Sequence, residues 1–375
     1  MVRIATFLLK FDCFFAKNYV KMFLSSPQSY TQGDMIMSTP FYWKTDLKYI
    51  ENAYFEAKNC SEKRILCQSA GNRPVYMLAY GEKKKLGRAN YSSALGARDK
   101  SHYCPKGQTP CVILIGAEHG SETEGVAAIT NLISLLETGV DLSGKRNDSL
   151  LEAAKKVRLV LVPVANVDGR ARVEPDCMIG KTFSELRYWA QGTWADGTIC
   201  SWPECKSVHP IKEAAGFLGG YYNDDGINLM HDKFFHPMAR ETQALLDLCE
   251  GEAADFVIHL HGGGNIKGGF LATDYATKEC SLAIEELYQR CQAVGDLEGL
   301  EYFHAAIPDI PSGENPLPCN LVSSTHHACG AVSACYESNE GILDEPGMPT
   351  RLTHEQILRM HEIMFEECFK MAVEK

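Results

Sequence analysis

The chain has 375 residues, of which 45% are hydrophobic and 23% are charged, a composition typical of a globular protein with one large domain or two small ones. Its 48 Asp and Glu residues against 37 Lys and Arg residues give a formal net charge of −11. This charge argues against nucleic acid or an anionic membrane surface as the main partner.

The 15 cysteines are scattered singly along the chain and form no C-x-x-C pair. Because disulfide frameworks are typical of short secreted chains, we expect most of these residues to be reduced, buried thiols in a cytoplasmic protein, with secretion as the alternative. Cys200, Cys205 and His209 are either plain loop residues or a small structural metal site, although structural zinc usually needs four closely spaced ligands.

The first 38 residues carry no clear periodic pattern. Their apolar stretch is interrupted by Lys10 and Asp12, so it is too short and too broken to span a membrane, and it lacks the clean apolar core of a signal peptide. We therefore predict that residues 1–38 are a loosely attached arm, that residues 39–375 form the folded domain, and that the chain has no membrane span.

In the first half of that domain, the sequence predicts four strands and one helix. Residues 64–81 predict two strands joined by a tight turn. Residues 109–117 form a continuous apolar strand, and residues 124–139 have the periodicity of a helix that stops at a glycine. Residues 157–169 predict another buried strand.

Residues 170–226 show no clear periodic pattern, and an irregular stretch of this length is more often functional than accidental. Beyond it, helices and strands alternate again. The expected helices cover residues 238–252, 275–295 and 354–374, and the expected strands cover residues 254–264 and 330–338. The alternation predicts a single α/β domain with one mixed, mainly parallel sheet and helices on both faces. In such sheets, ligands bind beyond the carboxyl ends of the strands.

Unusual polar residues lie at three of these strand ends. His119 and Glu122 follow the first apolar strand, His261 ends a second, and Glu337 ends a third. Two histidines and one carboxylate make a three-ligand set that leaves the fourth position of zinc open for water, which is the arrangement of catalytic zinc sites. We therefore predict one Zn²⁺ per chain, held by His119, Glu122 and His261.

His119 and Glu122 also have plainer interpretations when each is taken alone. His119 alone is consistent with a hydrogen-bonded loop histidine, and Glu122 with a carboxylate that favours the first turn of the next helix. His259 shares a strand face with His261, because side chains two residues apart on a strand point the same way. We select His261 because it lies nearer the end of the strand, and we expect His259 to support it.

These motifs resemble those of the zinc carboxypeptidase (M14-type) metallopeptidase superfamily. The H-x-x-E at His119 and Glu122 resembles its first two zinc ligands, and the second histidine of VIHLHGG, His261, resembles the third. The NVDGR stretch at 166–170 resembles the N-P-D-G loop of the same family, with valine in the proline position. The strand AVSACYESNEG resembles the one that carries the catalytic glutamate, which assigns that role to Glu337.

The resemblance covers residues 60–372 in family order and implies that residues 39–375 are a zinc carboxypeptidase-like catalytic domain. It implies a hydrolase in which zinc activates a water and Glu337 acts as general base, with Glu340 as the competing candidate. An arginine should stabilise the developing oxyanion. Arg187 is our candidate, with Arg170 and Arg172 as alternatives.

The chain departs from the family where an Asn-Arg pair holds the terminal carboxylate of the substrate. The corresponding stretch, GINLMHDKF, has Met230 and His231 in those positions. Arg170 and His231 are the candidate substrate-binding residues, and Tyr302 is the candidate for the mobile tyrosine of the family. We expect a peptide or an acylated amino compound as substrate. The alternatives are an N-acyl amino acid deacylase of the succinylglutamate desuccinylase or aspartoacylase type, and a non-catalytic peptide-binding protein that retains zinc; the oligomeric state is not predicted.

Overall fold

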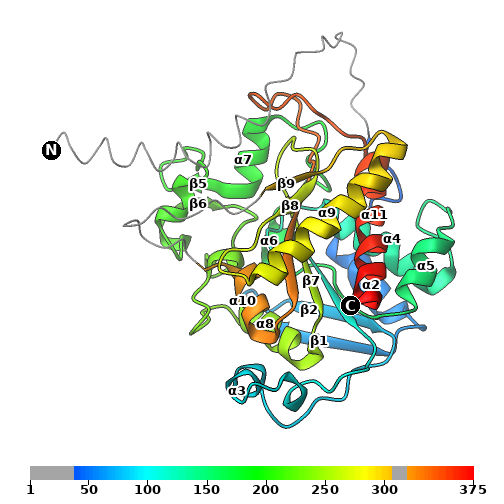
Figure 1. The fold of residues 1–375 in the computed structure, drawn as a ribbon. Helices are drawn as coiled ribbons and strands as arrows, with labels where there is room; N and C mark the ends of the chain where they lie inside the picture. The colour runs from blue at the N-terminus through cyan, green and yellow to red at the C-terminus, as the bar shows by residue number, and fades with distance from the viewer. Residues whose placement is uncertain (1–37, 306–318) are drawn as a thin grey trace.

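The computed structural model describes residues 38–305 and 319–375, so the predicted arm lies outside the described residues except for its last residue. In the described part of the chain, the main sheet has eight strands in the order β1-β2-β4-β3-β7-β10-β8-β9 (Figure 1). The four central strands β4, β3, β7 and β10 are mutually parallel, and β8 joins β10 in antiparallel fashion. The strands are β1 Glu62–Gln68, β2 Pro74–Tyr80, β3 Cys111–Gly116, β4 Arg158–Val162, β7 Phe256–Gly262, β8 Gly269–Leu271, β9 Phe303–Ala305 and β10 Val332–Ser338. The mixed, mainly parallel sheet predicted from the sequence is confirmed.

Helices cover both faces of this sheet (Figure 1). They are α2 Leu47–Glu56, α3 Tyr91–Gly96, α4 Glu124–Thr138, α5 Asp148–Ala154, α6 Val167–Arg172, α7 Phe183–Gln191, α8 Arg240–Glu252, α9 Lys278–Glu298, α10 Leu321–Cys329 and α11 His354–Glu374. Short 3₁₀ turns occur at η1 Lys100–His102, η2 Glu204–Ser207, η3 Lys212–Ala214 and η4 Leu229–His231, and a small ribbon pairs β5 Gly192–Trp194 with β6 Ala215–Leu218.

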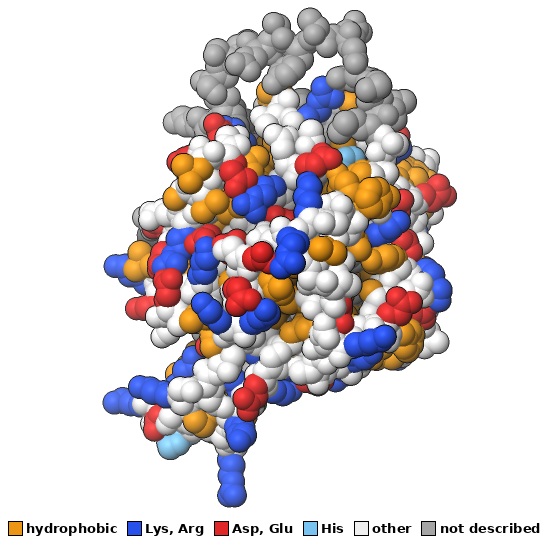
Figure 2. Space-filling model, turned by 90° about the vertical axis from the view of Figure 1, so that its right-hand side faces the viewer, with side chains coloured by type: hydrophobic (Ala, Val, Ile, Leu, Met, Phe, Trp, Pro, Cys, Tyr) orange, Lys and Arg blue, Asp and Glu red, His pale blue; other side chains and the backbone are white. Residues whose placement is uncertain are grey.

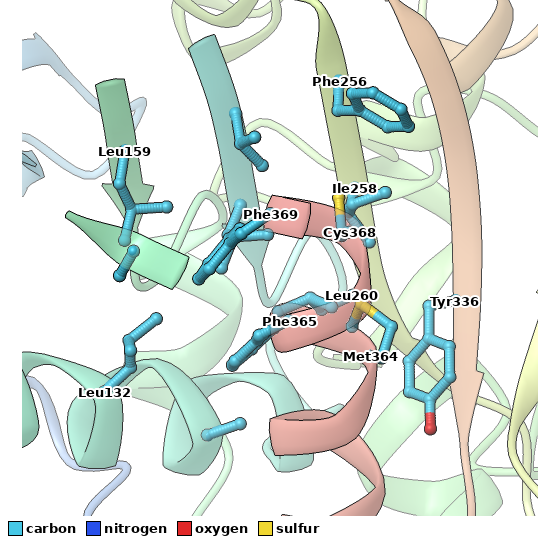
Figure 3. Close-up of a cluster of buried hydrophobic side chains, with 14 of the residues drawn as sticks. Leu132, Leu159, Phe256, Ile258, Leu260, Tyr336, Met364, Phe365, Cys368 and Phe369 are labelled. Atoms are coloured by element: carbon cyan, nitrogen blue, oxygen red, sulfur yellow. The ribbon is translucent and has the colours of Figure 1, made fainter. Parts of the chain in front are cut away.

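Successive side chains of the central strands pack alternately into two separate hydrophobic cores, one on each face of the sheet. In β7, Ile258 and Leu260 pack into the core covered by α4, α5, α9 and α11 (Figure 3). Val257 packs into the opposite core, which is covered by α2, α8 and α10. Because His259 and His261 follow Val257 at two-residue intervals, they point to this second face. The strand pattern therefore decides the face on which the polar residues gather.

The sequence-based elements differ from the structure mainly at the end of β4 and in the segment between β4 and β7. The strand expected over 157–169 ends at Val162, and Val167–Arg172 forms the short helix α6. The stretch expected to be irregular contains helix α7, which begins with a capping box between Thr182 and Glu185. This helix has only nine residues, too few for its apolar side to produce a clear period in the sequence.

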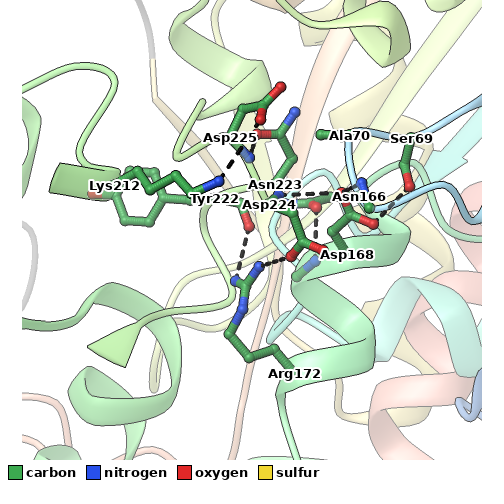
Figure 4. A network of polar contacts seen from close by, with 12 residues as sticks. Ser69, Ala70, Asn166, Asp168, Arg172, Lys212, Tyr222, Asn223, Asp224 and Asp225 are labelled. Atoms are coloured by element: carbon green, nitrogen blue, oxygen red, sulfur yellow. Dashed lines mark hydrogen bonds and ion pairs between the residues drawn. The ribbon is translucent and has the colours of Figure 1, made fainter. Parts of the chain in front are cut away.

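A buried carboxylate fixes the N-x-D-G loop to its surroundings (Figure 4). Asp168 accepts hydrogen bonds from Ser69 Oγ at 2.6 Å, from the Gly71 backbone N–H at 2.9 Å and from Arg73 Nη1 at 2.7 Å. It also accepts from the backbone N–H of Asp224 at 3.1 Å. One side chain thus ties α6 to the turn between β1 and β2 and to the segment that precedes η4.

The surface carries charges of both signs. In Figure 2, basic and acidic side chains are interspersed over the face shown.

No helix within residues 38–305 and 319–375 is long and apolar enough to cross a membrane. All cysteines in these ranges are free thiols, and most of them are buried.

Candidate active site

The parallel register of the central strands brings the predicted polar residues to one edge of the sheet. Glu337 of β10 is paired with His261 of β7, and Cys335 with His259. On the other side of β7, His259 is paired with Ile115 of β3, so the loop that follows β3 starts beside His261. Ala117, in that loop, has φ of +46°, a left-handed conformation that is uncommon for residues other than glycine. This turn directs the H-x-x-E segment over the strand ends.

The H-x-x-E segment packs closely against the N-x-D-G loop. The backbone N–H of Gly120 donates to Gly220 O at 2.7 Å. A Cβ atom at Gly120 would lie 2.1 Å from the backbone nitrogen of Arg170, so only glycine fits there. This contact fixes His119 and Glu122 relative to α6.

His119, Glu122 and His261 converge as the sequence predicted, with one ligand atom from each within 4.8 Å of the others. His119 Nδ1 lies 2.8 Å from Glu122 Oε1, and His261 Nδ1 lies 2.8 Å from Glu122 Oε2. All three residues are buried. In the part of the chain that the structure describes, this is the one group of three or more such residues with ligand geometry, and Cys200, Cys205 and His209 do not form another.

The remaining nitrogen of each histidine has its own acceptor. His119 Nε2 lies 3.2 Å from Asn228 Oδ1, and His261 Nε2 lies 3.2 Å from Glu118 Oε2. A metal-ligating histidine usually donates its second ring N–H to a carboxylate or carbonyl, which fixes its tautomer. The donor set therefore fits a zinc ion bound through the two Nδ1 atoms and the Glu122 carboxylate.

Glu118 is a part of this site that the sequence analysis did not identify. Its side chain is fully buried and also contacts His259, with 2.5 Å between Oε1 and Nδ1. Burial alone would raise the pKa of Glu118, but His259 and His261 hold it well below the ordinary value. The acidic residue directly before His119 was the only sequence signal, and it reads equally well as an ordinary loop residue.

Glu337 and Glu340 lie in different environments. Burial raises the pKa of Glu337, against the opposing effect of His261, and its side chain keeps partial exposure. Glu340 is 2% exposed, and its Oε2 accepts a hydrogen bond from the Gly264 backbone N–H at 2.7 Å. Burial raises the pKa of Glu340 well above its ordinary value. Of the two candidates for a general base, Glu337 is the one in register with His261.

The model of the family described as zinc carboxypeptidase matches residues 47–268, more than half of the chain. The chain belongs to the zinc carboxypeptidase family. The resemblance stated from the sequence is therefore confirmed, together with a zinc metallopeptidase-type hydrolase as the class of protein. Zinc is the metal of this family, and His119, Glu122 and His261 are its candidate site. Glu337 lies beyond the matched residues, so its assignment rests on strand register.

Solved structures of carboxypeptidases share the fold. A metallo-carboxypeptidase from Burkholderia cenocepacia has a TM-score of 0.51 at 12% identity, over 86% of this chain and 67% of that one. A putative carboxypeptidase from Burkholderia mallei has 0.53 at 12% identity, over 88% and 67%. Carboxypeptidase A from Helicoverpa armigera has 0.50 at 13% identity, over 89% and 74%. No curated protein sequence matches the chain.

The three arginines considered as oxyanion-stabilising groups differ in the number of hydrogen bonds that their guanidinium groups already donate. Arg170 is buried, and its guanidinium donates to the carbonyls of Thr45, Gly120 and Pro175. Arg172 donates to the carbonyls of Gly219 and Tyr222 and to the carboxylate of Asp224. Arg187 donates through Nη2 to Cys200 O at 3.0 Å and lies over the ring of Phe183. Of the three, Arg187 has the fewest hydrogen bonds to the rest of the described protein.

His231 lies at the end of η4, one turn beyond Asn228. Burial lowers the pKa of His231 to about 3, and the nearby Lys206 contributes to the shift. Tyr302 is 4% exposed, and its hydroxyl donates to Met360 O at 2.8 Å. Tyr302 is therefore a core residue on the face of the sheet away from the histidines, and its assignment as a mobile tyrosine is wrong.

Proposed function

We propose that this member of the family hydrolyses an amide bond at a zinc ion held by His119, Glu122 and His261. The observation that carries the proposal is the convergence of His119 Nδ1 and His261 Nδ1 on the two oxygens of Glu122, each at 2.8 Å. When bound, the ion supplies Lewis-acid chemistry, since it polarises a carbonyl and makes water more acidic. The open fourth position of such a set admits water and substrate.

In this proposal Glu337 is the general base. Its carboxylate takes a proton from the attacking water and later returns that proton to the nitrogen of the leaving amine. Three features support the role: register with His261, partial exposure, and a pKa raised by burial, which favours holding a proton between the two steps. Cys335 Sγ lies 3.5 Å from Glu337 Oε1, so we assign the proton transfer to the other oxygen, Oε2.

Arg187 is the proposed group for stabilising the oxyanion, because the guanidinium groups of Arg170 and Arg172 each already donate several hydrogen bonds within the protein. For Arg170 we propose an indirect contribution to substrate binding. Its contact with Gly120 O holds the H-x-x-E loop in place. In this division of roles, Arg187 serves the oxyanion through Nε or Nη1, since its described hydrogen bond to Cys200 O uses Nη2.

We propose that the substrate is not selected through a free C-terminal carboxylate. Arginine holds a carboxylate through two parallel charge-assisted bonds, whereas a neutral histidine offers one donor and methionine offers none. The low pKa of His231 keeps it neutral at physiological pH. This observation favours an acylated amino compound, or an amide bond that is not adjacent to a C-terminal carboxylate, over a conventional peptide with a free C-terminus.

The test is a hydrolysis panel with the zinc-loaded protein. N-blocked dipeptides, their C-terminal amides and N-acyl amino acids would be compared at equal concentration, with Glu337→Gln as the inactive reference. Turnover of any class that is lost in Glu337→Gln supports a hydrolase. If zinc binds tightly and no class is turned over, the alternative of a zinc-retaining binding protein replaces our proposal.

A further inference from the structure

Beyond the three proposed ligands, a chain of buried polar side chains leads away from His261. Glu118 lies between two histidines, with Oε2 3.2 Å from His261 Nε2 and Oε1 2.5 Å from His259 Nδ1. Glu118 and His259 are both 0% exposed, and His261 is 3% exposed. Because Glu118 is shielded from bulk solvent, its carboxylate depends on the two histidines for hydrogen bonds.

The far end of this chain is anchored in α10 and β10. His259 Nε2 lies 2.9 Å from Thr325 Oγ1 and 3.3 Å from Ser333 Oγ, and these two hydroxyls are 2.7 Å apart. Thr325 Oγ1 also donates to Val322 O at 2.9 Å. Thr325 and Ser333 are fully buried. Each ring nitrogen and carboxylate oxygen of His261, Glu118 and His259 therefore has a partner.

We propose that Glu118 is a positioning residue for the metal, held in place by His259 and Thr325. The inference rests on the proposed role of His261 as a ligand. The 3.2 Å contact between His261 Nε2 and Glu118 Oε2 favours the tautomer in which His261 carries its proton on Nε2 and donates it to the carboxyl oxygen. With a metal bound in place of the proton between His261 Nδ1 and Glu122 Oε2, that tautomer leaves the lone pair of Nδ1 for the metal. His259, which donates to the other oxygen, keeps Glu118 from rotating away.

The proposal separates His261 from His119. His119 Nε2 faces the amide oxygen of Asn228, a neutral acceptor. Of the two histidines, His261 is the one with a buried anion behind it, which makes its imidazole a stronger donor to the metal. Loss of Glu118 should therefore weaken metal binding through His261 while the rest of the site stays intact.

The experiment measures zinc affinity by competition with a chromophoric chelator, and the visible absorption spectrum after replacement of zinc by cobalt(II). The full chain is used as wild type, Glu118→Gln, Glu118→Ala and Thr325→Val. We expect a zinc dissociation constant that is about 10–100-fold higher for both Glu118 variants, and a changed cobalt spectrum. Thr325→Val should raise the constant less, and it should have no further effect in the Glu118→Ala background, because both changes remove the same support.

The matched control is Glu241→Gln, a change of the same size and charge at a glutamate that is 1% exposed and lies outside this chain of residues. It should leave the zinc constant and the cobalt spectrum unchanged. Wild-type values in folded Glu118→Gln and Thr325→Val would overturn the inference while leaving the proposed metal site intact. If Glu118→Ala does not fold, these two near-isosteric variants decide the matter. A wild-type protein that binds no zinc would overturn the proposed function itself, together with this inference.

Discussion

Glu337 and His261 are direct neighbours in the parallel pairing of β10 with β7, although 76 positions of sequence separate them. Both side chains point to the face of the sheet that carries the H-x-x-E loop. The pairing places a carboxylate beside a proposed zinc ligand without any contribution from a flexible loop. Catalytic groups on regular strands are held more precisely than groups on loops.

The first prediction concerns the general base. Glu337→Gln should retain zinc and thermal stability, and it should lower kcat by ~10²–10⁴-fold, because the amide cannot accept the proton of the attacking water. The measurement is steady-state turnover of the best substrate in the panel, with metal content recorded on the same sample. Glu340→Gln is the control and should keep most of the activity. If the two variants exchange these outcomes, Glu340 is the base.

The second prediction concerns the free carboxylate of a substrate. Since the pKa of His231 is lowered to about 3, the ring is neutral at both pH 6 and pH 8 and offers no positive charge at either. Matched N-blocked dipeptides with free and amidated C-termini should therefore be hydrolysed with similar kcat/KM at both pH values. A large preference for the free acid at pH 8 would show that another cation holds the carboxylate. A preference confined to pH 6 would show that His231 is protonated there, against its lowered pKa.

The third prediction concerns the boundary of the domain. Deletion of residues 1–38 should leave zinc content and the free energy of unfolding nearly unchanged. Trp43 lies just inside the boundary: it is 3% exposed, and its Nε1–H donates to Asp176 O at 3.2 Å. Trp43→Ala should therefore lower the free energy of unfolding by about 3–5 kcal/mol. Denaturant unfolding of both proteins checks the pair of expectations, and a deletion variant as unstable as Trp43→Ala would make the arm part of the fold.

Much of the proposed site is predictable from sequence because its residues follow continuous apolar runs. Such runs are buried parallel strands, and their carboxyl ends meet at one edge, so the sequence alone is enough to group His119, Glu122, His261 and Glu337. The face chosen by His259 and His261 follows from the two-residue period of a strand. The two cores on either side of the sheet follow from the same period.

The rest of the site depends on contacts between distant segments. Glu118 is identifiable only through His259, which lies 141 positions away in the sequence. The hydrogen bonds that Arg170 and Arg172 donate to backbone carbonyls likewise cannot be predicted without the tertiary structure. The strand predicted over 157–169 is too long because its apolar residues continue past Val162 into the N-cap of α6. A hydrophobic pattern does not distinguish the end of a strand from a buried turn.

The most direct test of the account is the zinc content of the purified full chain, measured by inductively coupled plasma mass spectrometry after dialysis. The wild type should contain one zinc per chain, and His119→Ala and His261→Ala should each lose most of it. His327→Ala is the control, because this exposed histidine bonds only to the Tyr275 carbonyl among the described contacts, and it should keep the metal. Full zinc content in both His119→Ala and His261→Ala would contradict the proposed site.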